Sequence, residues 1–218
     1  MIIFDCNGVL VDSERIVASV ASQELTRAGF ALAPEVFARY FTGRRPADMF
    51  TEIERAARRR LPANFELTLK TATLARFRRE LRATAHVVHA LTWLREPKCV
   101  ASSSPFDRIR LSLETTDLIR FFDPYLFSGT EVPKGKPAPD LFLLAAAKMH
   151  VQPADCIVVE DSPVGVAAAV AAGMTAIGFV GGSHAGDQLA TQLKQEGARV
   201  TFSDMRMLKS TIVNLRGW

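Results

Sequence analysis

From residue 98 onward, short apolar runs typical of buried strands alternate with segments whose apolar residues recur at helical spacing. The strand-like runs lie at residues 98–102, 125–127, 156–160, 175–180 and 199–202, and a further run, Ile2–Phe4, opens the chain. Strands that alternate with helices are joined by right-handed crossovers and form a mostly parallel sheet. The alternation therefore predicts an α/β fold in which the opening run belongs to the same sheet as the later ones.

A long segment after the first strand has helical patterns and no strand signal. Helices are expected near residues 16–28, 37–41, 46–57 and 67–81, and Pro46 suits the first position of a helix. The last of these is expected to bury Leu67, Leu74, Phe77 and Leu81. We therefore predict a helical cap domain over residues 14–83, inserted into an α/β core formed by residues 1–13 and 84–218.

The later helices have recognisable start signals. Ser104-Pro105 and Ser162-Pro163 each resemble an N-cap followed by a first-position proline, and Asp204 is expected to cap a C-terminal helix. Further helices are expected near residues 87–94, 139–149 and 187–196. These helices are expected to cover the sheet of the core.

The charge of the chain allows two interpretations. The net charge is +4, and much of the excess comes from eight arginines: Arg55, Arg58, Arg59, Arg60, Arg76, Arg78, Arg79 and Arg82. Such a cluster could attract nucleic acid or an anionic substrate, or it could be a solvated helix face. We favour the solvated face and expect no nucleic-acid partner, because no nucleic-acid-binding motif and few aromatic residues accompany the arginines.

Two features of the sequence bear on the cellular compartment of the protein. The uncharged stretch Val164–Gly182 is long enough to suggest a membrane span, but Gly173 divides it, so a buried helix and a buried strand explain it better. The three cysteines, Cys6, Cys99 and Cys156, match no metal-binding spacing and are odd in number. We therefore expect small buried thiols, no membrane contact, no signal peptide and a cytoplasmic protein.

Polar residues follow several of the predicted strands or precede the helices. They are Asp5 with Asn7, the run Ser102–Ser104, Lys136, and the pair Glu160-Asp161. Because the carboxyl ends of parallel strands lie on one edge of a sheet, these groups should converge there. Several acids suit Mg²⁺, whereas serine hydroxyls, free helix-start amides and a lysine suit a phosphoryl group. Taken singly, Asp5 could cap the next element, Ser102 could be an ordinary strand-end serine and Lys136 a solvated lysine.

Four segments carry a resemblance to a known family. They are Asp5-Cys-Asn-Gly-Val-Leu-Val-Asp-Ser-Glu14, Val100-Ala-Ser-Ser-Ser104, Gly135-Lys-Pro-Ala-Pro-Asp140 and Val158-Val-Glu-Asp-Ser-Pro-Val-Gly165. In this order they resemble the motifs of the haloacid dehalogenase-like (HAD) hydrolases, in the branch that contains β-phosphoglucomutase and sugar-phosphate phosphatases. The resemblance spans nearly the whole chain. It implies a Rossmann-like parallel sheet with an inserted cap of the helical C1 type.

The resemblance also implies roles for individual residues. Asp5 would be the nucleophile and a Mg²⁺ ligand, together with the backbone carbonyl of Asn7, Asp161, and Glu160 either directly or through water. The transferring phosphate would be bound by Ser102, Lys136 and the neighbouring Gly8, Ser103 and Ser104. Phosphoryl transfer depends mainly on positioning and charge stabilisation, which such groups supply.

In this family the loop that contains Arg44 and Arg45 faces the active site and helps to select the substrate. Solvated surface arginines are the alternative. Mutases of this branch have a histidine shortly after the first motif, but Arg15–Ala18 contain none, which favours a phosphatase. The pair Glu160-Asp161 argues against a metal-independent 2-haloacid dehalogenase. The remaining histidines, His86, His89, His150 and His184, show no ligand spacing and are expected to be structural or exposed.

Asn7 departs from the family pattern. Family phosphatases have an aspartate there, which acts as general acid and then as general base; asparagine keeps the backbone carbonyl but exchanges no proton. We predict a monomeric, Mg²⁺-dependent phosphatase of a small sugar, sugar-alcohol or sugar-acid phosphate that works through an aspartyl-phosphate and is slowed by an Asp-to-Asn change. The alternatives are a non-catalytic sugar-phosphate-binding homologue, a mutase and, less favoured, a dehalogenase.

Overall fold

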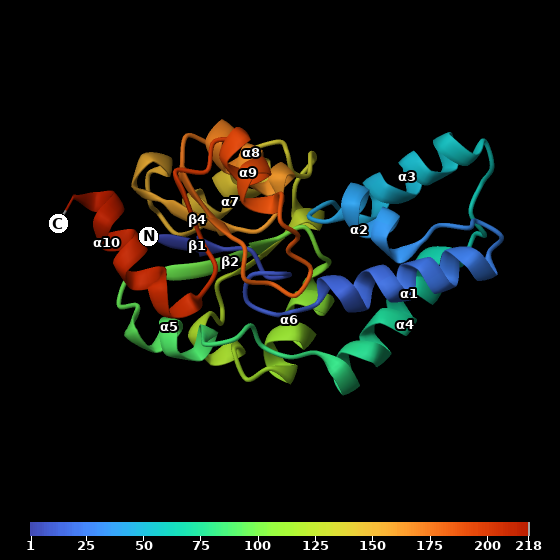
Figure 1. Ribbon diagram of the computed structural model, residues 1–218, viewed down its shortest axis with the longest axis horizontal. Coiled ribbons are helices and arrows are strands. Elements are labelled where there is room, and N and C mark those ends of the chain that lie inside the picture. The colour runs from blue at the N-terminus through green and yellow to red at the C-terminus, as the bar shows by residue number, and fades with distance from the viewer. Residues whose placement is uncertain (218) are drawn as a thin grey trace.

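The protein is built on one parallel β-sheet, as the alternation of strands and helices predicted. A computed structural model describes residues 1–217, and its six-stranded sheet has the order β3-β2-β1-β4-β5-β6 (Figure 1). The strands are β1 (Ile2–Phe4), β2 (Lys98–Ser102), β3 (Leu126–Ser128), β4 (Ile157–Glu160), β5 (Thr175–Phe179) and β6 (Val200–Phe202). The expected α/β class with a Rossmann-like core is therefore confirmed.

The first strand lies in the middle of the sheet. It pairs with β2 on one side, where Ile2 is in register with Lys98, and with β4 on the other, where Ile2 is in register with Ile157. All three residues of β1 are completely buried, which explains its continuous apolar sequence. Strand order reverses at β1, so the crevice beyond its carboxyl end is where sheets of this kind bind ligands.

Helices cover both faces of the sheet, each with its own hydrophobic cluster. On one face Phe4 and Val159 pack with Ile109 and Ile212 of α6 and α10, and on the other Ile3 packs with residues of α7, α8 and α9. The helices of this region are α5 (Val87–Trp93), α6 (Phe106–Thr115), α7 (Asp140–Lys148), α8 (Pro163–Ala171), α9 (Leu189–Gln195) and α10 (Leu208–Arg216). Short 3₁₀ turns lie at η1 (Ile119–Phe121), η2 (Gly129–Glu131), η3 (Pro153–Asp155) and η4 (Met205–Met207). The first face carries α5, α6 and α10 and the second α7, α8 and α9, so the sheet is enclosed on both sides (Figure 1).

Four helices between β1 and β2 form a separate group at the right of Figure 1. They are α1 (Glu14–Arg27), α2 (Pro34–Phe41), α3 (Pro46–Ala57) and α4 (Phe65–Glu80). Apolar side chains such as Leu25, Phe37 and Ile53 form a third hydrophobic cluster that is distinct from the two on the sheet. We call this group the helical cap.

Some sequence expectations differ from the structure. Leu67 was expected to face the interior, but 66% of it is exposed, because α4 buries the stripe Phe65, Leu69, Thr73 and Phe77 instead. The stretch Val164–Gly182 forms most of α8 and all of β5, and among the described residues no helix is long and apolar enough to cross a membrane.

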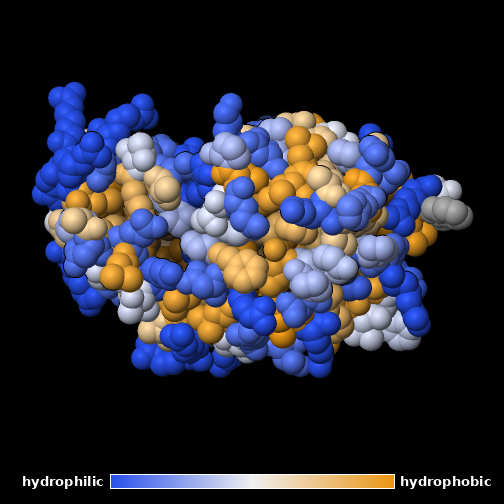
Figure 2. Space-filling model, turned by 180° about the vertical axis from the view of Figure 1, so that it is seen from behind, coloured by the Kyte–Doolittle hydropathy of each residue, from blue (hydrophilic) through white to orange (hydrophobic). Residues whose placement is uncertain are grey.

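The outer end of the cap carries most of the exposed charge of the arginine cluster. Arg55, Arg58 and Arg60 are exposed, and the cap end of the molecule, at the left of Figure 2, is edged with hydrophilic side chains. Arg60 pairs with Glu54, and Arg76 is half-buried and pairs with Glu80. These local pairs fit the solvated helix face that we favoured from the sequence.

Candidate active site

The carboxyl ends of three neighbouring strands bring the predicted polar residues together. Asp5 follows β1 directly, Ser102 ends β2, and Glu160 ends β4, with Asp161 next to it. The backbone amide of Asp5 still donates to the carbonyl of Val159 at 3.0 Å, so the sheet register fixes its position. All four side chains are buried, which is unusual for the three acids, because a buried carboxylate is costly unless a nearby charge or hydrogen bond compensates it.

Lys136 is the partner of two of these acids. Its Nζ lies 2.7 Å from Asp5 Oδ1, 2.5 Å from Glu160 Oε1 and 3.3 Å from the carbonyl oxygen of Ala101. Only 3% of the residue is exposed, so it is not the solvated loop lysine of the alternative interpretation. A buried ammonium between two carboxylates places a fixed positive charge beside the carboxylate that follows β1.

Burial and charge shift the protonation equilibria of this pair in predictable directions. Burial alone would lower the pKa of Lys136, but the carboxylates of Asp5 and Glu160 raise it above its ordinary value, so the lysine stays protonated. Burial raises the pKa of Asp5 well above the usual range, and Lys136 opposes that rise. A second cation at Asp5 would favour the ionised carboxylate that a nucleophile requires.

Glu160 is engaged through both of its oxygens. Oε1 accepts from Lys136, and Oε2 accepts from the backbone amides of Asp161 and Ser162 at 3.0 and 3.1 Å and from Ser162 Oγ at 2.9 Å. Ser162 Oγ also caps α8 by accepting from the Gly165 amide, as predicted from the Ser-Pro pair. Glu160 therefore orients Lys136 and the loop that carries Asp161.

Asp161 lies against two groups from distant parts of the chain. A Cβ added at Gly8 would come within 1.8 Å of Asp161 Oδ2, so only glycine at position 8, with its φ of +77°, leaves room for this carboxylate. On the other side His184 Nε2 lies 2.9 Å from the same oxygen. Burial raises the pKa of Asp161 to about 6 against the opposing effect of His184. Burial would lower the pKa of His184, but Asp161 and its neighbours raise it to about 9.

His184 was not predicted as a site residue. It belongs to the loop after β5, and only 10% of its side chain is exposed. No ligand spacing in the sequence indicates a role for it. The signal that the sequence did contain is its position, because His184 follows an apolar strand at the same sheet edge as the other site residues.

The three serines at the carboxyl end of β2, Ser102 to Ser104, have different partners. Ser102 Oγ accepts from the amide of Ser104 at 3.4 Å, whereas Ser103 Oγ donates to the carbonyl of Gly43 in the cap at 2.8 Å. The expectation that Ser104 is the N-cap of the next helix is wrong, because α6 begins at Phe106 and Pro105 occupies the N-cap position. The hydroxyl of Ser104 instead accepts from Asn7 Nδ2 at 2.9 Å.

The two cap arginines are committed to protein partners. Arg44 pairs with Glu52 of α3. Arg45 binds Asp48 at 2.8 and 3.0 Å, and its Nη1 donates to the carbonyls of three core residues, Gly129 at 3.4 Å, Val132 at 3.1 Å and Pro133 at 3.3 Å. Arg45 is thus not the solvated arginine of the alternative interpretation. It joins the cap to the core beside the site. This contact links residues far apart in the chain, so the sequence alone could not show it.

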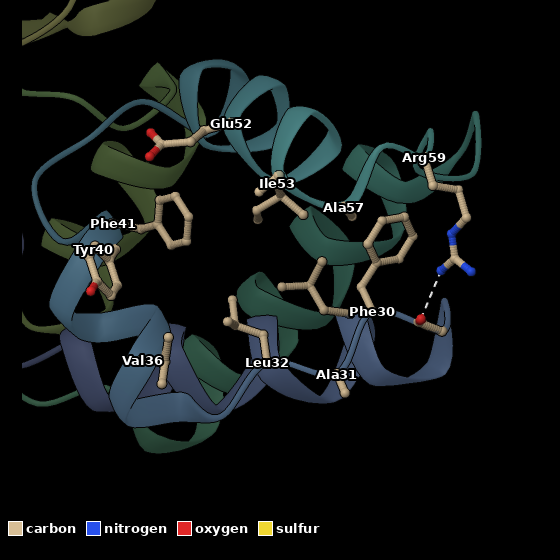
Figure 3. Close-up of a pocket in the computed structure, with 13 residues that line it drawn as sticks. Phe30, Ala31, Leu32, Val36, Tyr40, Phe41, Glu52, Ile53, Ala57 and Arg59 are labelled. Carbon is tan, nitrogen blue, oxygen red and sulfur yellow. Dashed lines mark hydrogen bonds between the residues drawn. The ribbon is translucent and has the colours of Figure 1, made fainter.

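A cavity in the cap lies away from Asp5. It has a volume of about 540 Å³, and Phe30, Phe41 and Ile53 surround its opening (Figure 3). Arg59 closes one end by donating to the carbonyl of Gly29 at 2.8 Å and stacking over Phe30. Its lining is mainly apolar, so it does not suit a phosphate ester.

Comparison with known proteins agrees with this arrangement. The profile of the haloacid dehalogenase-like hydrolases matches residues 1–173. The chain belongs to this family. The resemblance drawn from the four motifs is therefore confirmed.

Relatives of this HAD-like hydrolase include named phosphatases. The chain is 30% identical over 184 residues to 6-phosphogluconate phosphatase of Escherichia coli, covering 84% of this chain and 83% of that protein. It is 33% identical to a probable pseudouridine-5'-phosphatase of Drosophila melanogaster, covering 80% and 79% of the two chains. A solved structure of a haloacid dehalogenase-like protein of unknown function from Agrobacterium tumefaciens superposes with a TM-score of 0.84 at 36% identity, covering 99% and 98%. These relatives support the phosphatase branch of the family.

The donor set of this HAD-like hydrolase fits a hard cation of the kind its family implies. The described residues contain no group of three or more His, Cys, Asp or Glu side chains that could hold a metal. Mg²⁺ needs fewer, since proteins usually hold it with one or two carboxylates plus substrate phosphate and water. Asp5 and Asp161 are buried carboxylates that follow the neighbouring strands β1 and β4, and oxygen donors of this kind are the ligands that Mg²⁺ prefers. Asp5, Asp161 and the backbone carbonyl of Asn7 are the residues that would hold the ion.

Proposed function

We propose that this chain is a Mg²⁺-dependent phosphatase of a small sugar, sugar-alcohol or sugar-acid phosphate, slowed by Asn7. The observation that carries the proposal is the buried Asp5–Lys136–Glu160 array beside Asp161 at the switch point of the sheet. The named activities of the relatives, a 6-phosphogluconate phosphatase and a probable pseudouridine-5'-phosphatase, support a small phosphorylated substrate.

The proposed reaction has two displacements at phosphorus. A carboxylate oxygen of Asp5 attacks the phosphorus, the bond from phosphorus to the ester oxygen breaks, and the leaving oxygen takes a proton from solvent water to depart as the alcohol. Water then attacks the aspartyl-phosphate and gives up a proton to solvent, the bond from phosphorus to Asp5 breaks, and inorganic phosphate is released as the carboxylate is regenerated. Bound Mg²⁺ would supply charge stabilisation for the phosphoryl oxygens.

The chain's own residues supply positioning and positive charge. Lys136 keeps Asp5 in place and offsets negative charge at the site, while the hydroxyl of Ser102 lies at the end of the neighbouring strand. We propose that residues 14–83 act as a cap that excludes bulk water during the first displacement, and that the Arg45 and Ser103 contacts hold it against the core. From its place in the first motif, we propose that Asn7 takes the position from which the leaving oxygen would receive a proton, and its amide supplies none.

The direct test is phosphate release from a panel of phosphate esters. The panel includes 6-phosphogluconate, pseudouridine 5'-phosphate, hexose phosphates and p-nitrophenyl phosphate, each with Mg²⁺ and with EDTA. Both the chain as it stands and the Asn7→Asp variant are assayed, and Asp5→Asn in the same background serves as the inactive control. Release that requires Mg²⁺ and Asp5 supports the proposal, and no release from any ester by the Asn7→Asp variant would refute it.

A non-catalytic sugar-phosphate-binding protein is the second candidate, and Asn7 is the observation that favours it. Such a protein would bind one ester tightly, with neither the chain nor its Asn7→Asp variant turning it over. Calorimetric titration with the same panel separates the two functions. A mutase is less well supported, because no histidine lies between Arg15 and Ala18.

A further inference from the structure

His184 enters the site through a gap left by two glycines. A Cβ at Gly8 would lie 2.9 Å from His184 Cε1, and one at Gly182 would lie 2.7 Å from the same atom, so any side chain at either position would collide with the imidazole ring. The ring is therefore confined between the turn after β1 and the loop after β5. This confinement gives it one position beside Asp161.

The loop that carries His184 is anchored to the first motif. Both the amide and the hydroxyl of Ser183 donate to Asp12 Oδ1, at 3.2 and 2.7 Å. These contacts join residues that are 171 positions apart in the chain. These hydrogen bonds hold the loop, so the fold itself places the imidazole beside Asp161.

The contact between His184 and Asp161 joins two atoms that have no other partner. Nε2 and Oδ2 are 2.9 Å apart and both are buried, neither makes a hydrogen bond elsewhere, and Nδ1 of the ring also has no partner. Unpaired buried polar atoms are costly and uncommon in native structures. Asp161 Oδ1 is not among these buried unpartnered atoms, so the two oxygens of Asp161 have different surroundings.

We propose that His184 is a positioning residue that holds Asp161 Oδ2, so that the carboxylate presents its other oxygen to the cation. The inference rests on the proposed function, since it assumes that the chain binds a divalent cation with Asp5 and Asp161. Carboxylates that bind metals are themselves held by hydrogen bonds from a second layer of residues, and loss of such a partner typically weakens metal binding about 10–100-fold.

The test is the affinity of the chain for Mn²⁺, a paramagnetic substitute for Mg²⁺, measured by electron paramagnetic resonance of the free ion. We expect His184→Ala to raise the Kd about 10–100-fold. His184→Gln, whose amide keeps a donor, should recover part of the affinity. His150→Ala is the matched control, because His150 is exposed and follows α7 outside the site, and it should leave the Kd unchanged.

The outcomes separate this inference from the proposed function. A Kd for His184→Ala within twofold of the parent, with Mn²⁺ bound by the parent, would refute the role of His184 alone. No Mn²⁺ binding by the parent would refute both. Circular dichroism checks that each variant is folded. If His184→Ala is not folded, His184→Gln decides the inference. It must then bind Mn²⁺ more weakly than the parent and more tightly than Asp161→Asn.

Discussion

Only one of the two polar atoms of the Asn7 side chain has a hydrogen-bond partner. Its Nδ2 donates to Ser104 Oγ at 2.9 Å, but its Oδ1 is buried with no hydrogen-bond partner. A carboxylic acid at this position could donate a proton to a leaving oxygen and later accept one from water, whereas the amide can do neither. Under the proposed function, the amide would therefore keep the shape of this position without supplying a proton.

We predict that Asn7→Asp raises the rate of phosphate release. One general acid–base group is typically worth about 10²–10⁴ in rate, so kcat on the best ester of the panel should rise by that factor. The KM should change little, because the backbone carbonyl at position 7 is retained. Equal kcat values for the two proteins would show that this position takes no part in proton transfer.

Lys136 is the only cation in contact with two buried carboxylates, Asp5 and Glu160, among the described residues. We predict that Lys136→Met, which keeps most of the side-chain volume, lowers the free energy of unfolding by about 3–5 kcal/mol, as when one partner of a buried ion pair is removed. Urea unfolding at neutral pH measures the change. Lys148→Met, at an exposed position in α7, is the control and should change stability little. A loss below 1 kcal/mol would show that water or a bound cation already neutralises the acids.

At the scale of elements, the strands of the core were predictable and the cap was less so. All six strands lie within one residue of the expected ends, because each is a short apolar run bounded by polar residues. In α4 the sequence has apolar residues on more than one face, so periodicity alone did not identify Leu67 as exposed. Contacts that cross between elements, such as those of Arg45 and His184, leave no periodic signal.

The loop between α2 and α3 is expected to depend on Arg45. Arg45→Ala removes three hydrogen bonds to core carbonyls, so the loop should separate from the segment around Gly129 and Val132 more often. Hydrogen–deuterium exchange should show faster exchange at the amides of residues 42–45 and 129–132. Arg39→Ala, an exposed position in α2, is the control. Unchanged exchange in Arg45→Ala would show that the Ser103–Gly43 contact is sufficient to hold the loop.

At the scale of the whole molecule, the three thiols report on the integrity of the core. Cys6, Cys99 and Cys156 are fully buried, as the sequence predicted. Burial raises the pKa of Cys99 to about 12 and raises the pKa of the Cys6 and Cys156 thiols as well, so thiolate is scarce near pH 8. We predict no rapid reaction with Ellman's reagent in the native protein and reaction of all three thiols in guanidinium chloride. Rapid reaction of one thiol in the native state would reveal local opening near it.

The sequence also predicted that the residues at the strand ends lie together in one site. It did not predict the residues that the cap and the loops add to that site. Parallel strands place their carboxyl ends on one edge, so Asp5, Ser102 and Glu160 could be assigned to one site from the order of elements alone. The positions of Ser103 and Arg45 depend on how the cap packs against the core, and that of His184 on the course of one loop. Such packing arises from many weak contacts far apart in the chain and is not encoded in any short motif.

The central place of β1 has a consequence for how the chain is made. Its partners, β2 and β4, begin at Lys98 and Ile157, so on the ribosome the first strand emerges long before either neighbour exists. At about 5–20 residues per second, synthesis leaves Ile2–Phe4 without a complete sheet for many seconds, while the cap helices already have apolar partners among themselves. A nascent chain that stops short of β4 leaves at least one edge of this apolar strand without a partner, and exposed apolar strand edges of this kind favour aggregation.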